Sequence, residues 1–150
     1  MQFSGVMQLA QSVAFVWSRL SDARFLVDSL KKVEAITLRE ENCAEWKLRP
    51  ALAFVAGSLD SRLDITERQA PDRLHVVLTS KGIGSSSTVE VELRLTATAD
   101  GGTHVNWHAE IKALTGLLKM VPKGLIQSAA QKSIEDVWLG VAEKLAAEPV

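Results

Sequence analysis

Tyrosine is absent from this chain of 150 residues, and cysteine occurs once, as Cys43. The missing tyrosine removes a frequent proton donor of enzyme active sites, and a single cysteine cannot form an internal disulfide. No apolar run reaches the roughly 20 residues that a membrane-spanning helix needs. Residues 1–11 lack the basic start and continuous apolar core of a secretory signal. These absences predict a soluble protein of a reducing compartment, and we expect the cytoplasm.

Charge of one sign is also lacking, because 17 Lys and Arg stand against 18 Asp and Glu, for a net charge of -1. The basic residues are scattered, so no positive field arises of the kind that nucleic acids or anionic lipid surfaces require. Nucleic acid is therefore not expected as a partner. A composition that is 47% hydrophobic predicts a folded protein, and the length predicts one domain over residues 1–150.

A hydrophobic period of two residues runs from Val33 to Lys112 and predicts about six consecutive strands. Short turns join them, and strands joined in this way pair antiparallel. The turn signals are Glu41-Asn42, Ala56-Gly57, Pro71-Asp72, Gly82 to Gly84 and Asp100-Gly101-Gly102. The alternation of Met1 to Leu9 predicts one further strand.

Three of these strands carry one apolar and one polar face, so we expect a sheet with one wet side. The strand Thr88 to Thr98 directs Val89, Val91, Leu93, Leu95 and Ala97 to the apolar face. Ser58 to Gln69 and Thr103 to Lys112 repeat the pattern.

Helical periodicity appears at both ends of the chain. Ser12 and Asp22 are suited to cap two short helices, and Lys31-Lys32 suits the C-terminus of the second. A long helix is predicted from about Pro122 to Ala147, after an apolar connection over Ala113 to Val121. Its expected buried stripe is Ile126, Ala130, Ser133, Val137, Val141 and Leu145.

The order of these elements predicts an α+β helix-grip fold, in which a curved antiparallel sheet of about seven strands wraps round the long C-terminal helix. Ala129, Ala130, Ser133 and Gly140 are small helix residues that leave room for a cavity between helix and sheet. The alternative, in which bulky strand residues and the two short helices fill this space, stays open at the level of sequence.

Several features in order resemble the START-like, or SRPBCC, helix-grip superfamily, and within it the CoxG family of carbon monoxide dehydrogenase subunits. They are Phe3-Ser4-Gly5, Val16-Trp17 with Leu20 and Asp22, the Gly82 and Gly84 pair, Gly101-Gly102-Thr103 before Val105 and Trp107, and Gly116-Leu117-Leu118. The resemblance implies binding of a hydrophobic ligand and, for this family, an accessory role beside molybdenum hydroxylases with a quinone-like lipid. The chain departs from the family at Ser29 to Lys32, where members usually have Pro-Gly.

We therefore expect a small lipid-, quinone- or polyketide-like molecule to bind between sheet and helix, with no cofactor. The expected ligand-binding residues are Trp46, Leu48, Phe54, Leu59, Ser61, Leu63, Leu78, Ser87, Val89, Val91, Trp107, Ala109, Leu114, Leu117, Leu118, Ile126, Ala130 and Ser133. Trp107 is expected to contact the ligand, because an indole offers a large apolar surface and one donor.

Candidate catalytic and metal sites are weak. His104 and His108 share a strand face but lie about 13 Å apart at ~3.3 Å per residue, too far for one zinc ion. Asp60, Arg62 and Asp64 favour a surface charge ladder over an acid/base pair. Cys43 has no histidine near it in sequence, and Ser85 to Ser87 lead into a strand, whereas phosphate loops lead into a helix. No catalytic and no metal-binding residue is predicted.

Two other function classes remain open. A polyketide cyclase or dehydratase-like enzyme would need an acid or base facing the cavity. A scaffold would bind a partner protein in place of a ligand, and the candidate protein partners are a second copy of the chain or an enzyme subunit.

Overall fold

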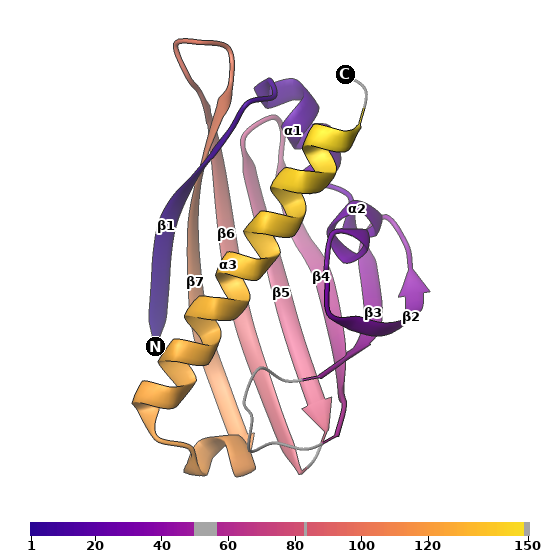
Figure 1. Cartoon of the computed structure of the whole chain (residues 1–150), viewed down its shortest axis with the longest axis vertical. Coiled ribbons are helices and arrows are strands. Elements are labelled where there is room, and N and C mark those ends of the chain that lie inside the picture. Colours follow the sequence, from indigo (N-terminus) through magenta and orange to yellow (C-terminus); the bar gives the residue numbers. More distant parts are fainter. Residues whose placement is uncertain (50–56, 83, 149–150) are drawn as a thin grey trace.

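The computed structural model describes residues 1–49, 57–82 and 84–148 and shows a sheet that wraps round one long helix (Figure 1). The sheet has seven antiparallel strands in the order β1-β7-β6-β5-β4-β3-β2. The strands are β1 (Gln2–Leu9), β2 (Val33–Arg39), β3 (Cys43–Leu48), β4 (Leu59–Gln69), β5 (Arg73–Gly82), β6 (Ser85–Ala97) and β7 (Thr103–Gly116). The helices are α1 (Val13–Leu20), α2 (Ala23–Asp28), the short 3-10 helix η1 (Leu117–Met120) and α3 (Lys123–Ala147). The predicted fold class is confirmed.

Strands β2 to β7 pair in chain order as the predicted meander, and β1 pairs with the last strand, β7. The turns at Glu41-Asn42, Pro71-Asp72 and Asp100 to Gly102 lie where the sequence predicts them. Of the two remaining turn signals, residues 56 and 83 lie outside the described residues. The alternation along β1 is confirmed as well, since Phe3 and Leu9 are buried and Val6 is exposed.

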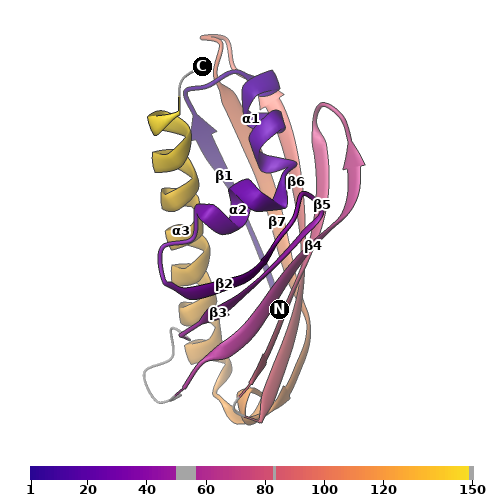
Figure 2. The ribbon, with the colours of Figure 1, turned by 90° about the vertical axis from the view of Figure 1, so that its right-hand side faces the viewer.

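The two short helices begin at the predicted caps. Ser12 Oγ accepts a hydrogen bond from the Phe15 amide, and Asp22 Oδ1 accepts one from the Arg24 amide, which satisfies N–H groups that have no partner within the helix. Both helices lie on the same side of the sheet as α3 (Figure 2).

Helix α3 packs across the concave face of the sheet, as expected, but its buried stripe differs from the predicted one (Figures 1 and 2). Ile126, Val141 and Leu145 are buried, whereas Ser133 and Val137 are exposed. Ile134 and Trp138, one position further along, are half-buried and face the core. The correction follows from the helical period, because 3.6 residues per turn fits a stripe through 134 and 138 as well as one through 133 and 137, and the bulkier pair takes the inner side.

The connection predicted over Ala113 to Val121 is shorter in the structure, because β7 continues to Gly116. An irregularity between Thr88 and Val89 shifts the register and lets Leu114 pair with Ser87. Gly116 then turns the chain into η1 with a φ of 65°. An ideal Cβ there would lie 1.7 Å from the Gly84 carbonyl oxygen, so only glycine fits.

The turn after α2, Ser29 to Lys32, contacts α3 directly. The Ser29 hydroxyl donates to the Leu26 carbonyl at 2.7 Å, and the Ser29 side chain is buried. Lys31 pairs with Glu143 at 2.6 Å, and Lys32 with Asp136 at 3.6 Å. Both lysines therefore pair with α3, and neither lies in the last turn of α2, where the sequence places their interaction. An ideal Cβ on Gly140 would lie 2.2 Å from the Ser29 carbonyl oxygen. The missing side chain of Gly140 therefore sets how closely α3 approaches this turn.

Replacing Gly140 by Ala is expected to lower the free energy of unfolding by about 1–3 kcal/mol, because the added methyl group overlaps backbone atoms that cannot move away cheaply. Chemical denaturation measures the effect. The matched control is Gly124→Ala on the same helix, where an ideal Cβ meets nothing within 4 Å. This control should stabilise the protein by up to about 1 kcal/mol through helix propensity. Equal effects at the two positions would show that the close contact with Ser29 is not limiting.

Candidate ligand-binding cavity

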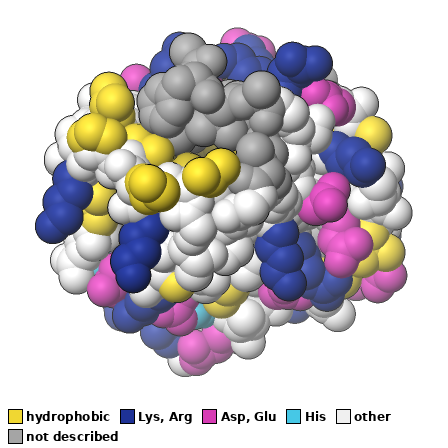
Figure 3. All heavy atoms as spheres, turned by 90° about the horizontal axis from the view of Figure 1, so that it is seen from below, with side chains coloured by type: hydrophobic (Ala, Val, Ile, Leu, Met, Phe, Trp, Pro, Cys, Tyr) yellow, Lys and Arg dark blue, Asp and Glu magenta, His cyan; other side chains and the backbone are white. Residues whose placement is uncertain are grey.

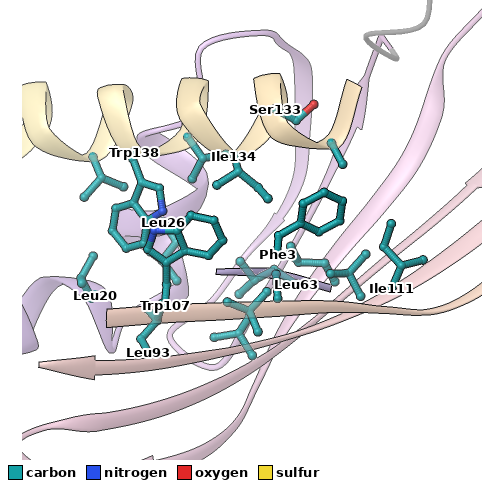
Figure 4. A pocket seen from close by; sticks show the side chains of 18 residues that line it. Phe3, Leu20, Leu26, Leu63, Leu93, Trp107, Ile111, Ser133, Ile134 and Trp138 are labelled. Carbon is teal, nitrogen blue, oxygen red and sulfur yellow. The ribbon is translucent and has the colours of Figure 1, made fainter. Parts of the chain in front are cut away.

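A cavity of about 280 Å³ lies between the concave face of the sheet and α3 (Figure 4). Strands β1 and β4 to β7 form its floor, and α1, α2 and α3 supply the remaining wall. The lining residues are Phe3, Leu20, Leu26, Leu63, Val76, Leu78, Val89, Val91, Leu93, Trp107, Ala109, Ile111, Ala130, Ser133, Ile134, Val137, Trp138 and Val141.

The floor is built from cross-strand neighbours, which point to the same face of a sheet. Strand pairing places the floor residues in three transverse rows: Leu63, Leu78, Val89 and Ile111; then Val76, Val91, Ala109 and Phe3; then Leu93 and Trp107. Every member is apolar, and residues two apart on a strand share a face, so the period-two pattern of the sequence produces the floor directly.

Two indoles line the cavity, one from the sheet and one from the helix. Trp107 points into it from β7 and Trp138 from α3 (Figure 4). Gly5, which pairs with Trp107, makes room for its ring, because an ideal Cβ on Gly5 would lie 2.8 Å from the indole. The side of α3 above the middle of the floor presents Ala130, a small residue.

The cavity reaches the surface beside the middle of α3. Ser133 and Val137 both line it and are exposed, Val137 to 37%. Leu78 and Val89 face α3 from the floor but remain only half-buried. A helix packed tightly against these strands would bury such residues, so the helix stands away from the sheet here.

The lining residues include no titratable side chain. The polar groups among them are the hydroxyl of Ser133 and the two indole N–H groups, and the Ser133 oxygen points away from the sheet (Figure 4). Within the described part of the chain, this cavity therefore offers no acid, base or nucleophile to a bound molecule.

Charged side chains of the strands pair on the opposite, solvent-facing side of the sheet. Arg73 donates to Glu92 at 2.7 Å, and this hydrogen bond lowers the pKa of Glu92. Arg62 bonds Asp64 at 2.9 Å and also pairs with Glu45, and these contacts raise the pKa of Arg62. The charge ladder predicted around Arg62 is thus present.

The other sequence candidates lie apart from the cavity. His104 and His108 alternate with buried residues of β7 and so lie on its outer side. Cys43 is half-buried, with its Sγ 4.0 Å from a carboxylate oxygen of Glu40. Among residues 1–49, 57–82 and 84–148, no group of three or more His, Cys, Asp or Glu side chains is arranged to hold a metal ion.

The structure brings part of the predicted ligand-binding set together at the cavity. The members that line it are Leu63, Leu78, Val89, Val91, Trp107, Ala109, Ala130 and Ser133. Sequence reasoning missed Phe3, Leu20, Leu26, Val76, Leu93, Ile111, Ile134, Val137, Trp138 and Val141. Val76, Leu93 and Ile111 each lie two residues from another floor residue on their own strand, so the period-two pattern carried a signal for them.

The remaining residues of the predicted ligand-binding set lie outside the lining of this cavity. They are Trp46, Leu48, Leu59, Ser61, Ser87, Leu114, Leu117, Leu118 and Ile126, whereas Phe54 lies outside the described residues. Leu117 and Leu118 belong to η1, and Leu117 is 53% exposed. Contact of any of these residues with a ligand stays a prediction.

No helix in the described ranges is both long and apolar enough to cross a membrane.

Comparison with known proteins identifies a family. The family model of CoxG, a carbon monoxide dehydrogenase subunit, matches residues 5–146. A search of curated protein sequences finds no match.

Solved structures share the fold at low sequence identity. A conserved protein from Geobacillus kaustophilus superposes with a TM-score of 0.84 at 20% identity, covering 97% of this chain and 95% of that one. A START superfamily protein from Mycobacterium smegmatis gives a TM-score of 0.70 at 8% identity, covering 97% of each chain. A protein from Thermus thermophilus gives a TM-score of 0.68 at 15% identity, covering 98% of each chain. The fold is therefore START-like, as the sequence predicts.

Replacing Ala130 by Leu is expected to raise the free energy of unfolding of the ligand-free protein by about 1 kcal/mol, because the larger side chain occupies part of the cavity. Thermal denaturation measures the change. Ala146→Leu, at an exposed position of the same helix, is the control and should shift stability by less than about 0.5 kcal/mol. A clear loss of stability in the Ala130 variant alone would mean that this space is filled, as in the solid-core alternative.

Proposed function

The chain belongs to the CoxG family of carbon monoxide dehydrogenase subunits, and from this premise we propose that it binds a small hydrophobic molecule in the cavity under α3. The molecule is lipid-, quinone- or polyketide-like, and the protein holds or carries it in the cytoplasm without changing it. In this proposal residues 1–150 form one domain, which contains the whole binding site.

One observation carries the proposal: the cavity is lined by apolar side chains and has no titratable group among its lining residues. Ligand cavities begin at roughly 300 Å³, and a ~150 Å³ apolar cavity already accepts benzene. The 280 Å³ found here corresponds to a molecule of about two fused rings or a branched chain of similar volume. Burial of such a body contributes about 25 cal/mol per Å² of apolar surface, which favours binding without any charged contact.

The family also supports an accessory role. The matching model is named for a component of carbon monoxide dehydrogenase, and we propose that the chain serves a molybdenum hydroxylase system by handling a quinone-like or other hydrophobic molecule. The protein partner is then an enzyme subunit, and association with a second copy of the chain is the alternative.

The enzyme hypothesis makes a different demand on the cavity. A polyketide cyclase or dehydratase needs a proton donor or acceptor beside its substrate, and the lining offers none among the described residues. Incubation with ester, thioester and polyketide-type substrates separates the two hypotheses, because a carrier returns them unchanged. Turnover lost on replacing Cys43 or a histidine would support the enzyme.

Native mass spectrometry of protein purified without detergent tests the proposal directly. A bound hydrophobic molecule adds a discrete mass, which organic extraction removes and identifies. A protein that carries no added mass, and that also fails to bind any of a panel of fused-ring and alkyl probes, would contradict the proposal.

Trp107→Phe is expected to weaken binding of naphthalene, an uncharged two-ring probe, severalfold, because the smaller ring removes contact area from the cavity wall. Its thermal midpoint should fall only slightly, since most of the packing volume remains. Fluorescence titration measures the affinity. Trp17→Phe is the matched control, because Trp17 is half-buried on α1 and does not line the cavity. Unchanged affinity together with a large drop in midpoint would make Trp107 a core residue.

A further inference from the structure

Strand β1 forms one edge of the sheet and pairs with β7 alone (Figure 1). In this pairing the Ile111 N–H donates to the Met1 carbonyl at 2.9 Å. Residues of an antiparallel strand that bond their neighbour alternate with residues whose backbone groups point the other way. The residues of β1 whose N–H and C=O groups point to the open edge are therefore Gln2, Ser4, Val6 and Gln8.

These edge groups have no backbone partner in the part of the chain that the structure describes. Strand β1 has no second neighbour in the sheet, and no backbone hydrogen bond joins the edge groups to a described turn or helix. Helix α3 lies over the concave face of the sheet and makes none of these bonds (Figures 1 and 2). A row of free donors and acceptors on an edge strand is a template for pairing with another strand.

The two edges of the sheet are built differently. Strand β2, at the opposite edge, has two shifts in its register and carries Glu34 and Arg39, both of which form ion pairs. Irregularities and charges of this kind hinder an edge strand from pairing with another chain. Strand β1 has neither, because its register with β7 is unbroken and residues 1–18 contain no Asp, Glu, Lys, Arg or His. Only the β1 edge is therefore suited to accept a further strand.

This edge is complementary to a second copy of itself. Two antiparallel β1 strands bond each other when their outward-pointing residues face one another. The register that uses all of these residues pairs Gln2 with Gln8 of the second copy and Ser4 with Val6 of the second copy. Each pair then exchanges two hydrogen bonds, and Gly5 lies on the two-fold axis between the strands.

The side chains that meet in this register are compatible. On the concave face Phe3 lies opposite Met7 of the second copy, so two apolar side chains come together. On the convex face Val6, which is 60% exposed in the single chain, lies beside Ser4 of the second copy. At both ends of the contact two glutamine amides face each other and can exchange hydrogen bonds. No like charges stand opposite one another, so nothing in β1 opposes the pairing.

We propose that two copies of the chain associate through β1, with the strands paired antiparallel about a two-fold axis at Gly5. The two sheets then continue as one, and both α3 helices lie on the same face. Phe3 lines the cavity, so the contact lies beside the cavity floor in each copy. The inference goes beyond the proposed function, because pairing of the edges requires no bound ligand.

Sedimentation velocity of the whole chain over a range of concentrations tests the proposal. A dissociation constant of roughly 1–100 µM is expected, because one pair of edge strands buries less than the ~800 Å² per partner of a standard interface. Monomer and dimer should therefore exchange across this range. A chain that stays monomeric at about tenfold above its upper limit contradicts the proposal.

Val6→Lys should raise the dissociation constant at least about tenfold, because the two lysines would be diagonal neighbours about 7–8 Å apart across the axis. Ile36→Lys is the matched control, since it adds the same charge at an exposed position of the opposite edge strand and should leave the dimer unchanged. Val6→Pro is a second variant. It removes an N–H that makes no bond within the sheet, so the fold is retained while the dimer is lost.

Spin labels attached at Gln8→Cys, in a Cys43→Ser background, test the register. With Gly5 on the axis, the two Gln8 Cα atoms lie six residues apart along the strands, about 20 Å at ~3.4 Å per residue. The next register in either direction changes this distance by about 7 Å. A distance that fits another register would overturn the placement of the axis at Gly5.

The outcomes bear on this inference separately from the proposed function. If both Val6 variants dimerise like the wild type, or if Ile36→Lys alone is monomeric, the β1 contact is overturned. A wild-type chain that is monomeric alone and pairs its β1 edge with an enzyme subunit overturns it as well. Circular dichroism shows which variants are folded, and naphthalene binding by the same samples tests the cavity independently of the dimer.

Discussion

The whole architecture depends on how α3 is held against the sheet at its two ends. Val141 and Leu145 are buried near one end and Ile126 near the other. Each such side chain contributes about 1.5–3 kcal/mol by leaving water. Gly140 lets the helix approach the turn after α2, where an ideal Cβ would lie 2.2 Å from the Ser29 oxygen. Fixed at both ends, the helix spans the concave sheet between them as a rigid rod.

The cavity is a consequence of this span. A twisted sheet curves away from a straight helix, so the gap is widest between the two contacts, and the side chains there decide whether it is filled. Ala130 offers only a methyl group on the helix side, and Leu78 and Val89 of the floor stay half-buried. Trp107 and Trp138 fill one end (Figure 4). What remains is an apolar space whose lining side chains lack van der Waals contacts on one side. An apolar molecule that supplied these contacts would stabilise the folded protein.

Hydrophobic side chains are also exposed on the surface where β7 passes into η1 and α3. Viewed from below, hydrophobic side chains gather beside charged ones on this surface (Figure 3). In η1 and at the start of α3, Leu117, Met120 and Leu125 are exposed. The charged side chains of the strands form ion pairs on the convex, solvent-facing side of the sheet. The concave side, which carries the cavity floor, is neutral.

The sequence predicted the strands, caps and turns because these depend on neighbours in the chain. Period two places Val89, Val91 and Trp107 on the concave face in any antiparallel arrangement. The positions facing the cavity from α3 were harder, because a choice between Val137 and Trp138 depends on the rotation of the helix over the sheet. Phe3 was missed for a similar reason, since β1 joins the floor only by pairing with β7 at the other end of the chain.

Ser61, Ser80 and Ser87, which pair across β4, β5 and β6, show where the sequence pattern is informative and where the strand pairing is needed. Ser61 and Ser87 stood out in sequence as polar residues on an apolar face, but Ser80 gained meaning only through its pairing with both of them. Apolar walls discriminate between ligands weakly, because one methylene more or less changes binding by only about 1–3 kcal/mol. The apolar floor of this cavity would therefore favour hydrophobic molecules in general and discriminate only weakly among them.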